Sequence, residues 1–350
     1  MHSVVTGGAG FIGSHLVEYL LAAGDRVTVI DDFSTGSLAN LEHLAGREVE
    51  IRHGSILDRH LVEDTIAGTH RVFHLAAAVG VRNIVDHPLE SLRTNIHGTE
   101  NVLDATRDAG ARLVLASTSE IYGKNAADRL HEDSDRVLGS PLVARWTYAA
   151  AKGIDESFAH AYWREFGLQV TIVRPFNTVG PRQTGRYGMV VPTLVGQALS
   201  GQPLTVYGDG RQTRCFSFVG DIVPALVRLS EQPRALGIAV NLGGGQEISI
   251  LQLAHRIVEL LGSDSQISLV PYELAYNEGF EDMRRRVPDN SLARELVDFV
   301  PRTGIDEIIL SVASGIAERG VARSVESGPA RATAGILRPH DVITGSRQLT

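Results

Sequence analysis

A glycine-rich turn between two short apolar segments constrains the fold of this chain more than any other feature. Gly8, Gly10 and Gly13 have the spacing G-x-G-x-x-G, and Gly7 extends it to G-x-x-G-x-x-G. Glycine is needed in such a turn because the chain reverses tightly, the backbone approaches a bound pyrophosphate, and the next helix packs close to the sheet. The pattern predicts a dinucleotide-binding unit composed of a strand at 2–6, a helix at 11–23 and a strand at 26–31.

An acidic residue at the end of the second strand indicates which dinucleotide is bound. Asp31 lies 21 residues after Gly10. A carboxylate there can accept hydrogen bonds from a ribose diol, and it repels the 2′-phosphate of NADP. The sequence therefore predicts NAD as the cofactor.

Short apolar segments alternate with helical patterns as far as residue 175, which is typical of a parallel sheet covered on both faces. We expect a Rossmann-type doubly wound α/β fold with a smaller C-terminal lobe, where glycine and proline punctuate the sequence. The predicted units are an NAD-binding domain at 1–175 with some later segments returning to it, a substrate-binding lobe at 176–318, and a disordered tail at 319–350. Further strands are expected at 48–52, 70–76, 111–117 and 169–175, and further helices at 88–109 and 145–167.

The composition argues against several other classes of protein. The formal net charge of −8 disfavours nucleic acid as a partner. Cys215 is the only cysteine, and the 13 histidines include no H-E-x-x-H motif, so neither a disulfide nor a metal centre is expected. No apolar segment has membrane-spanning length, and the N-terminal residues run directly into the glycine turn. We expect a cytoplasmic enzyme without a membrane partner.

Three residues have the chemistry for removing a proton from a substrate hydroxyl. Tyr148 and Lys152 are four residues apart on a helical pattern, and Thr118 follows the apolar segment 111–117. A phenol titrates near ~10, but a neighbouring ammonium and the positive charge of oxidised nicotinamide both favour phenolate. We predict Tyr148 as the base, Thr118 as the group that orients the oxygen, and Lys152 as the group that lowers the tyrosine pKa.

Taken together, these motifs resemble the extended short-chain dehydrogenases/reductases that epimerise, dehydrate or decarboxylate nucleotide sugars. The resemblance covers about residues 2–315. It implies a UDP-sugar substrate, NAD that stays bound between turnovers, and a homodimer formed through helices 88–109 and 145–167. Further matching stretches are 73–77, 94–99, 174–177, 203–210 and 212–214.

The resemblance also implies the residues that line the site. Ser55 departs from the family, which usually has an acid at this position near the adenine. The implied cofactor-binding residues are Gly7, Gly10, Phe11, Ile12, Gly13, Asp31, Ser34, Thr35, Ser55, Ile56, Leu75, Ala76, Ala77, Asn95, Tyr148, Lys152 and Pro175. The implied substrate-binding residues are Thr118, Asn177, Arg186, Val191, Thr205, Tyr207, Arg214 and Arg286, the last on the diphosphate side.

The choice of reaction depends on a few residues. Dehydratases of this family usually have Asp-Glu after the threonine, so Ser119 disfavours dehydration, whereas Ser119-Glu120 resembles UDP-glucuronate decarboxylases. Residues 144–148 differ from those decarboxylases, and the loop 181–192 resembles UDP-glucuronic acid 4-epimerases, in which Arg186 would pair with the sugar carboxylate. We predict an isomerase that interconverts UDP-glucuronate and UDP-galacturonate. A UDP-glucuronate decarboxylase, a UDP-glucose 4-epimerase and a non-catalytic NAD-binding sensor are the alternatives.

Overall fold

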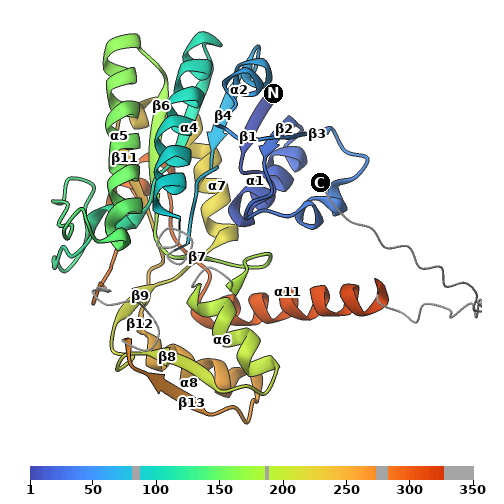
Figure 1. Ribbon diagram of the computed structural model, residues 1–350, viewed down its shortest axis with the longest axis vertical. Helices are drawn as coiled ribbons and strands as arrows, with labels where there is room; N and C mark the ends of the chain where they lie inside the picture. The colour runs from blue at the N-terminus through green and yellow to red at the C-terminus, as the bar shows by residue number, and fades with distance from the viewer. Residues whose placement is uncertain (81–86, 186–188, 273–282, 327–350) are drawn as a thin grey trace, which may run out of the picture.

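A seven-stranded parallel sheet lies at the centre of the computed structural model, which describes residues 1–80, 87–185, 189–272 and 283–326, with side chains to residue 319 (Figure 1). The strand order is β11-β6-β5-β4-β1-β2-β3. The first six strands begin and end within two residues of the predicted positions, and the predicted Rossmann-type fold is confirmed. The strands are β1 (His2–Thr6), β2 (Arg26–Asp31), β3 (Val49–His53), β4 (Arg71–His74), β5 (Arg112–Ala116), β6 (Val170–Pro175) and β11 (Ala239–Leu242).

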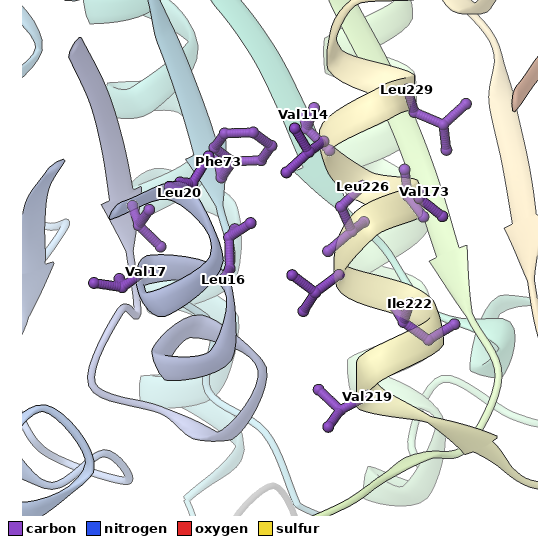
Figure 2. Packing of buried hydrophobic residues seen from close by; sticks show 14 of the residues in the cluster. Leu16, Val17, Leu20, Phe73, Val114, Val173, Val219, Ile222, Leu226 and Leu229 are labelled. Carbon is purple, nitrogen blue, oxygen red and sulfur yellow. The ribbon is translucent and has the colours of Figure 1, made fainter. Parts of the chain in front are cut away.

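Helices cover both faces of this sheet because each presents an apolar stripe to it. On one face, Leu16 of α1 and Leu226 of α7 pack toward Phe73 of β4 and Val114 of β5 (Figure 2). On the other face, α2, α4 and α5 enclose a second buried cluster. The covering helices are α1 (Phe11–Ala22), α7 (Val219–Ser230), α2 (Arg59–Ile66), α4 (Pro88–Asp108) and α5 (Thr147–Phe166).

The chain changes direction across the sheet at β1. From β1 it continues to β2 and β3 on one side, and then crosses to β4, β5 and β6 on the other. Because all of these strands are parallel, their carboxyl ends meet at one edge, and ligands of such sheets bind at the point where the strand order reverses. The glycine turn after β1 and the segments that follow β4 and β5 therefore meet at this edge.

A smaller lobe lies below this edge in Figure 1 and is built mainly from the second half of the chain. Leu194 of α6, Val206 of β8, Leu253 of α8 and Ile309 of α11 share one buried cluster. The elements of this lobe and its connections are α6 (Val190–Leu199), β8 (Leu204–Tyr207), α8 (Ile250–Leu261), β13 (Ile267–Val270), α11 (Ile305–Glu326), β7 (Thr178–Val179), β9 (Thr213–Cys215), β10 (Ser217–Phe218) and β12 (Glu247–Ser249). Short helices elsewhere are η1 (Leu38–Asn40), η2 (Glu42–Leu44), η3 (Ser119–Tyr122), η4 (Ala144–Trp146), η6 (Pro233–Ala235) and α10 (Ser291–Val297).

The chain alternates between the two parts after residue 176. Helix α7, strand β11 and helix α10 all return to the sheet. Helix α11 continues to Glu326, so the boundary predicted at 318 falls inside a helix, and residues 327–350 lie outside the described residues. Within the part of the chain that the structure describes, no helix combines the length and the apolar character needed to cross a membrane.

Candidate active site

A cavity of ≈ 1170 Å³ opens at the carboxyl edge of the sheet and is lined from both parts of the molecule. Pockets for one drug-sized ligand enclose about 300–1,000 Å³, so this volume suits more than one small ligand. The cavity brings together most of the residues that the sequence predicts for cofactor and substrate. Those lining it are Gly7, Gly10, Phe11, Ile12, Gly13, Asp31, Ser34, Thr35, Ile56, Leu75, Ala76, Ala77, Thr118, Ser119, Glu120, Tyr148, Lys152, Pro175, Asn177, Val191, Thr205, Tyr207, Arg214 and Arg286.

Among the predicted residues that the structure describes, Ser55 and Asn95 do not line the cavity. The Ser55 hydroxyl accepts a hydrogen bond from the Leu57 amide at 3.2 Å and so closes a local turn. The buried Asn95 amide holds the backbone of Ala78, from whose N–H it accepts a hydrogen bond at 2.8 Å. Asn95 thus supports a loop that lines the cavity instead of lining it itself. Arg186 lies outside the described residues.

The glycine turn has a shape that side chains would destroy. A Cβ atom on Gly13 would lie 2.1 Å from the carbonyl oxygen of Gly7, and one on Gly7 would lie 2.8 Å from the Ala76 nitrogen. Gly7 also has a φ of 71°, in the left-handed region. Helix α1 begins at Phe11, so the free amides of its first turn lie at the cavity and suit an anion. This geometry fits the pyrophosphate of a dinucleotide.

Asp31 joins the glycine turn to the end of β2. Its two carboxylate oxygens accept hydrogen bonds at 2.8 Å from the backbone amides of Ala9 and Phe33. Burial raises the pKa of this carboxyl, and the two amide hydrogen bonds only partly offset the effect. Each carboxylate oxygen has a further lone pair, so Asp31 can still accept hydrogen bonds from a ribose diol.

The fold brings Thr118, Tyr148 and Lys152 together. Thr118 follows β5 and caps η3, where its hydroxyl accepts a hydrogen bond from the Glu120 amide at 3.1 Å. Tyr148 lies in the first turn of α5, and its side chain is hydrogen-bonded to that of Thr118. Lys152 lies one turn further along the same helix and is only 2% exposed. The hydroxyl, phenol and ammonium groups therefore come from two elements that meet at the cavity.

The predicted lowering of the Tyr148 pKa is not found in the protein alone. Burial raises this pKa, and the negative charges of Glu120 and Asp155 raise it further. The Lys152 ammonium, which was expected to lower it, is paired with the Asp155 carboxylate at 3.2 Å. Tyr148 is consequently a neutral phenol until more positive charge enters the site.

Glu120 lies between two arginines at the cavity wall. One carboxylate oxygen accepts a hydrogen bond from Arg145 at 2.5 Å, and the other accepts one from Arg286 at 2.7 Å. Burial alone would raise the pKa of Glu120, but Arg286 and Arg145 lower it to about 2. Arg145 also stacks on Trp146, with its guanidinium 5.3 Å from the ring centre. Glu120 is therefore a fixed negative charge at neutral pH.

Arg286 connects two other residues of the cavity wall. Its guanidinium donates hydrogen bonds to Glu120 at 2.7 Å and to the Asn177 side chain at 2.6 Å. Its predicted position on the diphosphate side of the substrate stays a prediction. Arg145 was missed because a lone arginine before Tyr148 has no recognisable motif. Its contact with Glu120 exists only after η4 and η3 pack together. Spacing along the sequence gives no signal for such a contact.

Comparisons with known proteins agree with this geometry. A model of the "NAD dependent epimerase/dehydratase family" matches residues 3–243. A UDP-N-acetyl-alpha-D-glucosaminuronate decarboxylase of Bacillus cytotoxicus is 40% identical over 305 residues, which cover 87% of this chain and 94% of the relative. UDP-glucuronic acid decarboxylase 1 of Xenopus tropicalis is 39% identical over 306 residues, covering 87% of this chain and 69% of the relative.

Solved structures are similar over nearly the same length. The UDP-glucuronic acid 4-epimerase from Bacillus cereus, in complex with UDP-glucuronic acid and NAD, has a TM-score of 0.81 and 27% identity. The match covers 91% of this chain and 100% of that one. The epimerase Mth375 from Methanothermobacter thermautotrophicus has a TM-score of 0.84 and 28% identity, covering 92% and 94% of the two chains.

Proposed function

We propose that this chain, which belongs to the NAD-dependent epimerase/dehydratase family, decarboxylates a UDP-hexuronic acid to a UDP-pentose. Its glycine turn fits NAD, the cofactor of that family. The observation that carries this proposal is the Glu120 carboxylate held by Arg145 and Arg286 beside Thr118. Relatives that are 40% and 39% identical over 87% of the chain are decarboxylases of such sugars, which supports the same reaction.

The isomerase predicted from the sequence is wrong, since these relatives are carboxy-lyases. Two features had favoured epimerisation: the residues preceding Tyr148 and the loop 181–192. Of the residues preceding Tyr148, Thr147 does not line the cavity, whereas Arg145 lines it and binds Glu120. Arg186 of the loop lies outside the described residues. Glu120 lies in the cavity wall and was therefore the better guide to the reaction.

The first step requires removal of a proton from the sugar 4-hydroxyl. When bound, NAD supplies the hydride acceptor for oxidation at carbon 4 and later the hydride donor. Tyr148 accepts the hydroxyl proton, and Thr118 holds the same oxygen through its own hydroxyl. Burial keeps the phenol neutral in the protein alone, so the phenolate forms only when a further positive charge lies beside it.

The second step takes place beside the Glu120 carboxylate, which Arg145 and Arg286 bind. A ketone at carbon 4 lies β to the carboxylate of a uronic acid. The bond between carbons 5 and 6 can therefore break: its electrons pass to the ketone as CO₂ leaves, and the resulting enolate takes a proton from water at carbon 5. Tyr148 is protonated in the first step, so its hydroxyl and that of Thr118 can both donate to the oxygen that gains negative charge. Glu120 orients the guanidinium groups of Arg145 and Arg286 at the same cavity wall, because its oxygens bind both arginines.

Incubation with UDP-glucuronate labelled with ¹³C at carbon 6 tests the reaction. We expect labelled CO₂ and a UDP-pentose, measured by NMR. UDP-N-acetylglucosaminuronate in a parallel incubation identifies which uronic acid is preferred, because relatives of both specificities are known. Formation of UDP-galacturonate without CO₂, or no turnover of either sugar, would refute the proposal.

Two adjacent arginines provide a matched pair of variants. Arg286→Ala removes a guanidinium that is 7% exposed and binds Glu120, so we expect CO₂ release to fall by roughly 100-fold or more. Arg285 points outward and pairs with Glu247, and Arg285→Ala should retain most of the activity. Equal effects of the two substitutions would mean that Arg286 has no special role in catalysis.

A further inference from the structure

A buried carboxylate faces Lys152 from one turn further along α5. Asp155 has no exposed surface, and its Oδ2 lies 3.2 Å from the Lys152 Nζ. We propose that Asp155 is a positioning residue, which fixes the Lys152 ammonium at the cavity wall and reduces the positive charge that Tyr148 experiences. This role concerns the proton-transfer step and does not depend on whether the sugar loses CO₂.

The surroundings of Asp155 explain why it needs Lys152. A charged carboxylate that is buried without a partner is costly, and removal of one member of a buried pair destabilises a protein strongly. Burial raises the pKa of Asp155, whereas Lys152 lowers it. Residues three apart on a helix share one face, so α5 itself brings the two groups together. Lys152 is thereby held in place by its own helix.

Other charged or titratable groups near this pair are already engaged. Glu156 pairs with Arg174 at 2.6 Å. On β4, His74 is hydrogen-bonded to the hydroxyls of Thr6 and Thr99, and burial together with the Lys152 charge lowers its pKa to about 3. His74 is consequently neutral at neutral pH and does not replace Asp155 as the counter-ion of Lys152.

The pair also has a defined relation to the cavity. An ammonium has three N–H donors, so Lys152 can donate to a ligand in the cavity while it remains in its ion pair with Asp155. Lys152 lines the cavity, whereas Asp155 is not among the lining residues. The negative charges of Glu120 and Asp155 both raise the pKa of Tyr148 and so disfavour its phenolate form. Asp155 thus combines two opposing effects: it orients Lys152, and it weakens the electrostatic activation of Tyr148.

Asp155→Asn tests the proposal because it removes the charge and keeps the shape. The absorbance of tyrosinate is followed against pH in the NAD-loaded, full-length protein, and each form is compared with its Tyr148→Phe counterpart to isolate Tyr148. We expect the titration midpoint of Tyr148 to fall in the variant, by up to about one pH unit, because the negative charge of Asp155 raises the pKa of Tyr148. An unchanged or higher midpoint would overturn the proposal.

Glu156→Gln is the matched control, since it neutralises the adjacent carboxylate, whose partners are Arg174 and Ser117. Its Tyr148 midpoint should match that of the wild type, and an equal fall in both variants would refute a specific role for Asp155. If Asp155→Asn does not fold, the double variant with Lys152→Met should fold, because both buried charges are then absent. Failure of the double variant as well would mean that Asp155 acts only through packing. None of these measurements uses a sugar, so they remain informative if the protein releases no CO₂.

Discussion

Tyr148 has the polar contacts of a base but a pKa that its buried surroundings raise. We expect Tyr148→Phe to retain NAD, because the substitution leaves the glycine turn and the first amides of α1 unchanged, and to lose at least ~100-fold in turnover. Absorbance of the purified variant gives the NAD content, and product formation gives the rate. Retention of more than about a tenth of the wild-type rate would exclude Tyr148 as the main base.

His74 makes the stability of the protein depend on pH. Burial, with the Lys152 charge, lowers its pKa from 6.5 to about 3, so the unfolded chain binds a proton in a range where the folded protein does not. The contribution of neutral His74 to the free energy of unfolding is fully present above pH 6.5 and is lost as the pH falls toward 3. The slope of this loss approaches ~1.4 kcal/mol per pH unit. In His74→Gln, the melting temperature should depend less steeply on pH between 7 and 5 than in the wild type. Parallel curves would contradict this assignment.

At the scale of single elements, the entry into α1 tolerates the least change. Gly13→Ala would bring a methyl group to 2.1 Å from the Gly7 carbonyl oxygen, so the first turn of α1 must move. We expect loss of bound NAD and a lower melting temperature. Gly196→Ala in α6 is the control, because nothing lies within 4 Å of the added atom and alanine favours a helix by about 0.5–1 kcal/mol. NAD retention in Gly13→Ala would show that the turn can adjust.

The elements with local periodicity were predictable from the sequence, and those defined by distant pairing were not. The first six strands alternate with helical patterns, and their ends were placed within two residues. Strand β11 was missed because its four residues, Ala239–Leu242, are too few to show an apolar alternation in the glycine-rich second half of the chain. The residues of the site differ in predictability for the same reason. Tyr148 and Lys152 belong to a motif, whereas the pairing of Arg145 with Glu120 depends on how two elements pack.

At the scale of the whole molecule, α11 ties the C-terminal lobe together through its first half. Ile308, Ile309 and Val312 are at most 1% exposed, and each such side chain stabilises the fold by about 1.5–3 kcal/mol. We expect a chain that ends at Gly320 to keep its melting temperature and activity, and one that ends at Gly304 to lose both. Calorimetry of the two truncated proteins distinguishes them. A large loss of stability in the longer form would place important contacts beyond residue 320.

The strand order also affects folding during synthesis, because the ribosome synthesises the chain from its N-terminus. Strands β1 to β6 are complete at residue 175, whereas β11 ends at Leu242 and Arg286 follows later still. At synthesis rates of about 5–20 residues per second, this delay lasts seconds. During that interval β6 is an open edge, and such edges promote aggregation until they are paired. The residues that bind the dinucleotide are therefore synthesised before those that complete the sugar-binding side. The nascent protein is most prone to aggregation in the interval between the two.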